Sequence, residues 1–193
     1  MPYFTNLADI ARRTGYPVVE QPGWRGRGHG AMSGVRSVVC HHDAARQGAG
    51  TFNTVIQNGR SDLPGPLAQF ALRRDGTIHV VAAGLSYHAG ATINDAVFGN
   101  SWSLGIEAGN DGVGEVWPER QLDAYAKLCL ELSRAFGFSI DNIKGHKEIC
   151  RPAGRKSDPT FDMNAFRARV RAVADGAPAP GPRATPIVVL ESR

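Results

Sequence analysis

The sequence predicts an α/β domain, built on one mixed central β-sheet that is flanked by helices. Short apolar runs typical of buried strands, "VRSVVCHHD" and "SLGIEAGN", alternate along the chain with amphipathic segments of helical period. Two further runs, in "LAQFALRRDGTIHVVAAG", surround an Asp75-Gly76 turn, which is a strong signal for an antiparallel hairpin. Alternating strands and helices with one hairpin indicate a sheet of mixed strand direction in a single domain.

The clearest helix is "PERQLDAYAKLCLELSRAFG", where Pro118 suits the first turn and Gly137 the C-terminal cap. One face of this helix is apolar and carries Leu122, Tyr125, Cys129, Leu132 and Phe136. "FDMNAFRARVRAVA" predicts a final amphipathic helix, and shorter helices are expected at about 6–13 and 51–58. "SIDNIKGH" is a short strand candidate, and "SYHAGATINDAVFGNSW" is expected to be a long polar loop.

Three segments are expected along the chain. Residues 1–33 form an N-terminal arm, which is rich in glycine toward its end. Residues 34–174 form the domain. Residues 175–193 contain "GAPAPGPRATP", a Pro/Ala-rich linker or tail that has little means of burying a core.

Composition places the chain among ordinary globular proteins, with 193 residues, 42% hydrophobic and 21% charged. No apolar run approaches the roughly 18 residues of a membrane helix, and the first residues lack the pattern of a secretory signal. The net charge of +4 is spread along the chain, so nucleic acid is not the expected partner. A basic surface instead favours an anionic polymer such as a cell wall.

The sequence has three cysteines, Cys40, Cys129 and Cys150. Their odd number and wide spacing argue against a disulfide framework. Cys40 lies in an apolar run and Cys129 on the apolar face of a helix, so both are expected to be small core residues.

Polar residues at strand ends are the first candidates for a functional site. His41, Glu107 and His146 lie at or near the ends of predicted strands, where the active sites of α/β sheets gather. His41 and His42 are neighbours on one strand and point to opposite faces. One of the two should therefore face a site, while the other packs or meets solvent.

The stretch "GHKEICRPAGRKSDP" concentrates reactive groups on one irregular loop. Zinc favours histidine nitrogen, cysteine sulfur and carboxylate oxygen, and a catalytic zinc uses three protein ligands. After His146 the loop offers Cys150 four residues later and Asp158 twelve residues later. Spacing alone leaves both open as a further ligand, and a thiolate is a strong zinc ligand.

Five motifs occur in order: "VVCHHD", "RRDGTIHVVAAG", "YHAG", "SLGIEAGN" and "GHKEICRPAGRKSDP". Together they resemble the type-2 N-acetylmuramoyl-L-alanine amidases, a family that includes phage endolysins, wall-recycling amidases and peptidoglycan recognition proteins. The resemblance covers about residues 34–172 and is greatest to endolysin amidase domains of actinobacterial phages. It implies the amidase and peptidoglycan recognition protein fold.

The resemblance also implies a ligand set. The first histidine of the family's "HH[TS]" motif binds zinc, which corresponds to His41, and the "GH" motif supplies His146. "GRKSDP" is similar to the recycling-type motif "GRK[ST]DP", which favours Asp158 over Cys150 as the third ligand. Zn²⁺ is therefore the expected cofactor.

The implied catalytic residues are Lys156, two residues before Asp158, and Glu107 in the strand that resembles "IGIE". Other branches of the family use a tyrosine where this sequence has Ala68, so Glu107 is expected to carry more of the work.

Three residues are candidates for substrate binding. His88 of "YHAG" matches a family position at the wall of the cleft, with local hydrogen bonding as the alternative. Asn100 and Trp102 lie on the loop that leads to Glu107 and are candidates for a sugar or peptide subsite, with core packing as the alternative for Trp102.

The expected function is zinc-dependent hydrolysis of the amide bond between N-acetylmuramic acid and L-alanine in peptidoglycan. We expect a monomeric phage lysin with no membrane partner, made in the host cytoplasm without a signal peptide and acting on the wall after release. One alternative is an amidase that recycles soluble muropeptides. Another is a non-catalytic peptidoglycan-binding module, although such modules usually lack a zinc ligand and all three are present here.

Overall fold

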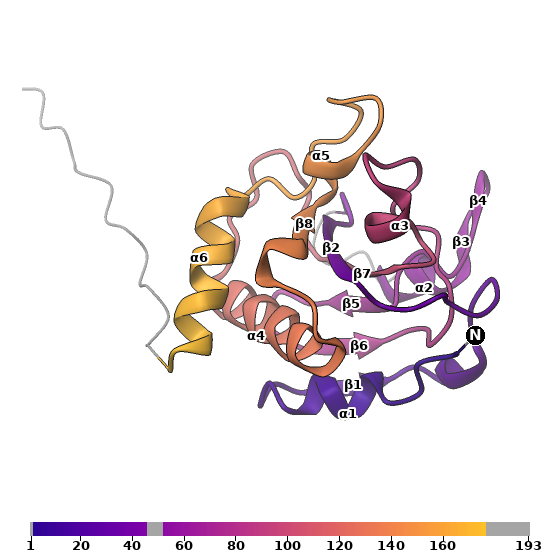
Figure 1. The fold of residues 1–193 in the computed structure, drawn as a ribbon, viewed down its shortest axis with the longest axis horizontal. Helices are drawn as coiled ribbons and strands as arrows, with labels where there is room; N and C mark the ends of the chain where they lie inside the picture. Colours follow the sequence, from indigo (N-terminus) through magenta and orange to yellow (C-terminus); the bar gives the residue numbers. More distant parts are fainter. Residues whose placement is uncertain (1, 46–51, 177–193) are drawn as a thin grey trace, which may run out of the picture.

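A computed structural model describes residues 2–45 and 52–176, and its centre is a six-stranded sheet (Figure 1). In spatial order the strands are β1 (Val18–Glu20), β6 (Ile78–Val80), β5 (Phe70–Leu72), β7 (Ser103–Ala108), β2 (Ser37–His42) and β8 (Ile143–Gly145). Neighbouring strands are parallel except β5 and β6, which form the antiparallel hairpin. The predicted mixed sheet is confirmed. A separate small hairpin joins β3 (Gly59–Arg60) to β4 (Leu63–Pro64).

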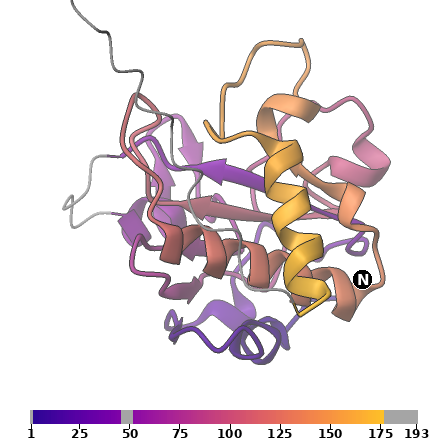
Figure 2. The ribbon, with the colours of Figure 1, turned by 90° about the vertical axis from the view of Figure 1, so that its left-hand side faces the viewer.

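Helices cover both faces of the sheet. The large core lies on one face, beneath α1 (Leu7–Arg12), α4 (Glu119–Phe136) and α6 (Met163–Ala174). Figure 2 shows α6 beside α4, with α1 below them. The shorter helices α2 (Phe52–Asn58), α3 (Asp95–Phe98) and α5 (His146–Ile149) contribute to two small clusters on the opposite face. Two 3-10 turns, η1 (Trp24–Gly26) and η2 (Ile140–Asn142), complete the described elements.

The alternation of side chains along the strands decides which residues face the short helices. Val38 and Cys40 of β2 point into the large core, whereas Val39 packs in a small cluster on the other face. Since successive strand residues alternate, His41 shares the face of Val39. The same alternation in β7 places Glu107 on that face. The site residues of both strands therefore lie on the side of α2, α3 and α5.

Helix α4 agrees with its sequence signals. It starts directly after Pro118 and ends before Gly137, whose φ of 73° is left-handed and suits glycine. Tyr125 and Cys129 on its expected apolar face are completely buried. The short helices near 6–13 and 51–58 are also present, as α1 and α2.

Residues 2–33 are not a separate arm, in contrast to our expectation. β1 is an edge strand of the main sheet, and Leu7, Ile10 and Trp24 are buried in the large core. A three-residue strand is too short to show a period in the sequence, which explains why composition alone suggested a loop. The expected polar loop after Leu85 likewise contains α3. Most of the expected tail, 177–193, lies outside the described residues.

No helix within the described ranges combines the length and the apolar character that crossing a membrane requires.

Candidate active site

A cleft of about 370 Å³ lies where β2, β7 and β8 end. Its polar lining consists mostly of ionisable side chains from these strand ends, from β3, from the segment after Leu85 and from the loop before Pro159. These are His41, His42, Asp43, Arg60, His88, Glu107, His146, Arg155, Lys156 and Asp158. This position agrees with the general rule that open α/β sheets bind ligands beyond the carboxyl ends of their strands.

Three side chains in the cleft converge on one point. The Oδ2 atom of Asp158 lies 2.8 Å from Nδ1 of His41 and 3.2 Å from Nδ1 of His146. One potential ligand atom from each residue lies within 4.8 Å of the other two. Two imidazoles and a carboxylate in this arrangement could hold a metal ion.

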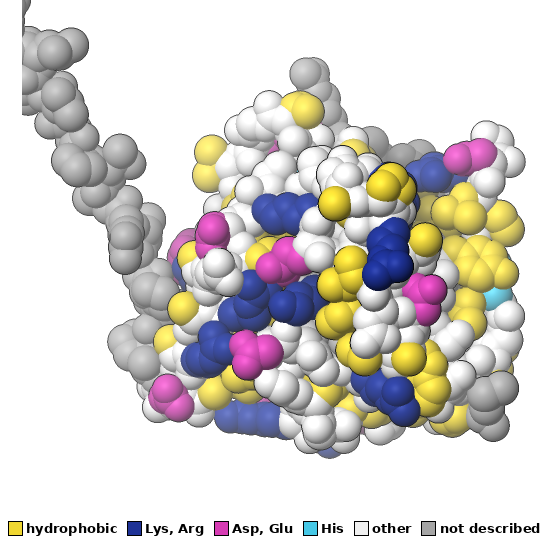
Figure 3. Space-filling view, turned by 45° about the horizontal axis from the view of Figure 1, so that its top comes forward, with side chains coloured by type: hydrophobic (Ala, Val, Ile, Leu, Met, Phe, Trp, Pro, Cys, Tyr) yellow, Lys and Arg dark blue, Asp and Glu magenta, His cyan; other side chains and the backbone are white. Residues whose placement is uncertain are grey.

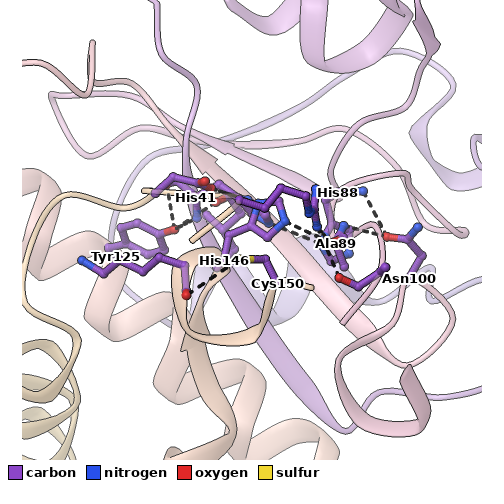
Figure 4. A network of polar contacts seen from close by, with 12 residues as sticks. His41, His88, Ala89, Asn100, Tyr125, His146 and Cys150 are labelled. Carbon is purple, nitrogen blue, oxygen red and sulfur yellow. Dashed lines mark hydrogen bonds and ion pairs between the residues drawn. The ribbon is translucent and has the colours of Figure 1, made fainter. Parts of the chain in front are cut away.

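The other nitrogen of each imidazole has its own contact. Nε2 of His146 donates to the carbonyl oxygen of Ala89 at 2.9 Å, and Nε2 of His41 lies 3.3 Å from Nδ1 of His88 (Figure 4). A donor hydrogen bond at Nε2 fixes the tautomer of His146, so that its Nδ1 carries the lone pair. The ring is thereby oriented for a metal on the side of Asp158.

Electrostatics favour the protonation states that bind metal. Burial lowers the pKa of His41 to about 4, so this imidazole is neutral at physiological pH. Burial alone would raise the pKa of Asp158, but its close contacts with the imidazoles of His146 and His41 hold it well below its usual range. Neutral histidine and ionised carboxylate are the forms that coordinate metal ions.

The local fold brings the distant Asp158 back to His146. The N–H of Lys147 donates to the carbonyl oxygen of Asp158 at 2.9 Å, which closes the loop between them. Glu148 accepts a hydrogen bond from the N–H of Gly145 and pairs with Arg167 of α6. These contacts fix the start of α5, where His146 is the first residue.

Glu107 lies beside this cluster as a partly buried acid with a buried, unsatisfied oxygen atom. Its Oε2 atom has no hydrogen-bond partner among the residues that the structure describes. Burial raises its pKa well above the usual value, and the negative charges of Asp158 and Asp43 act in the same direction. A carboxyl group with a raised pKa inside a cleft is a candidate for proton transfer.

Lys156 also lines the cleft, and its positive charge affects the pKa values of His41 and Glu107. That charge is among the smaller influences on two pKa values: it lowers that of His41 and opposes the rise at Glu107.

Cys150 lies outside the cluster. Its sulfur is buried and contacts the carbonyl oxygen of Lys147 at 3.9 Å. Cys40 and Cys129 are buried as well, and all three cysteines are free. Of the two ligand candidates that spacing left open, the structure brings Asp158 and not Cys150 to the two histidines.

The three candidates for substrate binding have different positions. His88 lines the cleft, and its Nε2 lies 3.2 Å from the carbonyl oxygen of Ser103. Asn100 does not line the cleft, because its Oδ1 accepts from the backbone N–H groups of His88 and Ala89. Trp102 precedes β7, at the opposite end from Glu107, and stacks with Arg36 at 3.7 Å. The placement of Asn100 and Trp102 thus gives no support to a subsite role.

Sequence reasoning missed several residues of the site. Asp43 directly follows the histidine pair, and burial raises its pKa to about 6. Tyr87 lines the cleft next to His88. Ala68, at the position where other branches of the family have a tyrosine, is completely buried. Tyr125 supports His41 from behind: its hydroxyl accepts from the N–H of His41 at 2.9 Å. The position of Asp43 after two histidines was a usable signal, but the helical period marked Tyr125 only as a core residue.

A cluster of two histidines and a carboxylate beside a partly buried acid, at the carboxyl ends of parallel strands, is an arrangement typical of metal-dependent hydrolases. The sequence profile of one such family, N-acetylmuramoyl-L-alanine amidase (Amidase_2), matches residues 31–161, and the chain belongs to this family. Among curated proteins, no sequence matches the chain significantly.

Solved structures of amidases share this fold. An endolysin amidase, LysCS from Clostridium intestinale URNW, is 20% identical with a TM-score of 0.59, covering 80% of this chain and 95% of its own. AmpD is 22% identical with a TM-score of 0.60, covering 79% and 93%. AmiD from E. coli, in complex with anhydro-N-acetylmuramic acid-L-Ala-D-gamma-Glu-L-Lys, is 17% identical with a TM-score of 0.54, covering 83% and 66%.

Proposed function

We propose that this chain is a zinc-dependent amidase that hydrolyses the bond between N-acetylmuramic acid and L-alanine in peptidoglycan. The observation that carries the proposal is the convergence of His41, His146 and Asp158 in the cleft, with ligand atoms within 4.8 Å of one another. Membership in the amidase family points to the same reaction. The AmiD structure contains a substrate with this linkage, which supports the same substrate class here.

The donor set fits zinc. Two neutral imidazoles and one carboxylate are a common ligand set of catalytic zinc, which keeps a further position open. His41, His146 and Asp158 would hold the ion. Zinc bound there would act as a Lewis acid and lower the pKa of a bound water to about 7.

Glu107 would move the proton during hydrolysis. In this proposal its carboxylate accepts a proton from the attacking water and then donates it to the amide nitrogen of the leaving L-alanine. Its unpartnered Oε2 atom suits the first of these steps, and its raised pKa suits the donation of the proton in the second. The ammonium group of Lys156 would stabilise the negative charge that develops on the carbonyl oxygen, an effect often worth a few kcal/mol.

We further propose that the enzyme is a phage lysin that acts on the intact wall. Its similarity to endolysins supports this role, and its net charge of +4 suits an anionic polymer. The similarity to AmiD, whose structure contains a small anhydro-muropeptide, favours the second candidate, an amidase that acts on soluble muropeptides.

One experiment tests the reaction and the metal together. The purified protein is analysed for bound metal, and digested peptidoglycan is analysed by mass spectrometry. We expect stoichiometric zinc and stem peptides with a new L-alanine amino group. Products cut between sugars or within the stem peptide would contradict the proposal. Clearing of intact sacculi favours a lysin, whereas action on small anhydro-muropeptides alone favours recycling.

Two variants test the third ligand. Asp158→Ala should lose zinc and activity, because it removes the carboxylate that both histidines contact. Cys150→Ala is the matched control and should keep both, since its sulfur lies outside the cluster. The reverse result would make Cys150 the ligand.

A further inference from the structure

One wall of the cleft ends in a pair of stacked rings. Tyr87 and His29 lie face to face, with ring centroids 3.7 Å apart and planes within 4° of parallel. Tyr87 is 37% exposed and lines the cleft. Because His29 covers one face of the phenol ring, the exposed part is its remaining face and edge. No reaction step proposed above uses either residue.

The segment that carries His29 is firmly attached to the segment that carries Tyr87. The N–H of His29 donates to the carbonyl oxygen of Leu85 at 2.8 Å, and the N–H of Leu85 donates to that of Gly30 at 2.9 Å. The two backbones approach so closely that a Cβ on Gly28 would lie 2.6 Å from Cα of Gly84. The aromatic pair is therefore held in place before any ligand binds.

The surroundings of Tyr87 are apolar. Its N–H donates to the carbonyl oxygen of Pro66 at 3.0 Å, which places it beside the segment that contributes Leu63 and Leu67 to the cleft. Val55 of α2 lines the same cleft. In Figure 3 hydrophobic side chains gather, with a histidine at their edge, on the side where Figure 1 shows β3 and β4.

Apart from Arg60, which pairs with Leu63 in the β3–β4 hairpin, the charged groups of the cleft come from other segments. Arg155 and Lys156 belong to the loop that also carries Asp158. Their positive charges suit the carboxylates of a stem peptide. An aromatic side chain with a polar edge, such as Tyr87, instead suits an uncharged sugar ring. Tyr87 directly precedes His88, which contacts His41. A group on the sugar side of the scissile amide, one lactyl unit away, would therefore lie within reach of Tyr87.

We propose that Tyr87, stacked on His29, is a binding surface for the pyranose ring of the N-acetylmuramyl group. This inference rests on the proposed function and specifies which part of the substrate this wall contacts. The segment 27–30, which precedes the family match at residue 31, thereby contributes to substrate recognition.

The test compares two substrates that share the scissile amide. One is N-acetylmuramoyl-L-alanyl-D-isoglutamine, and the other is D-lactoyl-L-alanyl-D-isoglutamine, which lacks the sugar ring. Tyr87→Ala should raise KM for the first about 3- to 10-fold, as expected for loss of one aromatic contact, with kcat nearly unchanged. The second substrate should be unaffected. Tyr87→Phe should restore the wild-type KM, and His29→Ala should give an intermediate value.

An equal loss on both substrates, or a loss in kcat alone, would overturn the proposal. A second measurement does not depend on catalysis: binding of the muramyl dipeptide to metal-free protein, followed by saturation-transfer NMR. Weaker binding by Tyr87→Ala supports the sugar contact, whereas unchanged binding, or no binding to the wild type, contradicts it. Failure of the proposed function is distinct, because it would appear as absent hydrolysis of both substrates by the zinc-loaded wild type.

Discussion

His41 and Glu107 are register partners on the adjacent parallel strands β2 and β7. Adjacent strands lie about 4.8 Å apart, and both side chains point to the face of the short helices. The pairing places a candidate metal ligand and a partly buried acid side by side without any contribution from a flexible loop. A site built on strands holds its geometry more precisely than one built on loops.

Glu107→Gln should therefore keep the metal and lose turnover. The amide has nearly the shape of the carboxyl group but cannot accept a proton, so kcat should fall by about 10²- to 10⁴-fold. Zinc content and amide hydrolysis are measured on the same preparation. Glu131→Gln on α4, away from the cleft, is the control and should behave as wild type. Near-normal turnover of Glu107→Gln would remove its proposed role.

The raised pKa of Glu107 should also reduce the stability of the metal-free protein as pH rises. Above the usual value of 4.5, the folded protein keeps a proton on Glu107 that the unfolded chain releases. The folded state then binds more protons, so the free energy of unfolding decreases with rising pH until Glu107 ionises in the folded state. Glu107→Gln lacks this penalty, so its Tm relative to wild type should increase as pH rises above about 4.5, until Glu107 ionises in the folded wild type.

Calorimetry in the presence of a chelator measures this difference. A difference between Glu107→Gln and wild type that stays constant as pH rises would show that Glu107 is not held protonated by its surroundings.

Much of the site could be predicted from the sequence, because its residues lie at recognisable strand ends or in a motif. What the sequence could not show is how a twelve-residue loop returns to its start. Two contacts close this loop: the hydrogen bond from the N–H of Lys147 to the carbonyl oxygen of Asp158, and the ion pair between Glu148 and Arg167. Both join segments that no periodic sequence pattern connects. They explain why Asp158, and not the nearer Cys150, lies at the two histidines.

The fold shows the same limit. Long elements such as α4 can be recognised from the period of their apolar residues and from their capping residues. β1, in contrast, is three residues long and pairs with β6, which lies in a distant part of the chain. Whether such a short segment becomes a strand depends on the sheet edge with which it can form hydrogen bonds. This dependence on tertiary context is the reason that residues 2–33 were expected as an arm.

Lys156 should affect turnover and not metal binding. Its charge lies in the cleft but it is not one of the three converging residues. Lys156→Met should lower kcat by about 10²- to 10³-fold, comparable to removal of one oxyanion donor, and Lys156→Arg should recover part of the loss. Single-turnover kinetics and metal analysis provide the measurements. Lys127→Met on α4 is the control. Loss of zinc in Lys156→Met would instead indicate a structural role.

Tyr125→Phe should weaken metal binding by a structural route. The hydroxyl accepts from the N–H of His41 and lies 2.9 Å from the carbonyl oxygen of Ile106, so it links the backbones of β2 and β7. Its removal leaves a buried N–H without this partner, at a cost of about 1–3 kcal/mol. We expect a lower Tm and roughly 10-fold weaker zinc affinity, because supporting contacts orient metal ligands.

Tyr16→Phe is the matched control for that variant. Tyr16 likewise has a hydrogen-bonded hydroxyl, which donates to the carboxylate of Asp123 at 2.7 Å, but it does not line the cleft. It should lose some stability and keep the wild-type zinc affinity, measured by chelator competition. Equal zinc affinity of both variants would show that Tyr125 contributes only to packing.

Gly105→Ala should disturb the cleft through His88. A Cβ at Gly105 would lie 2.6 Å from Cγ of the His88 ring, which is buried against this position of β7. The ring must shift, and with it the contact between His88 and His41. We expect a loss of about 1–3 kcal/mol in the free energy of unfolding, as for other overpacked sites, together with reduced turnover. Gly26→Ala is the control, since no atom lies within 4 Å of a Cβ there. Urea unfolding and activity assays measure both effects, and a Gly105→Ala protein as stable and active as wild type would show that His88 tolerates displacement.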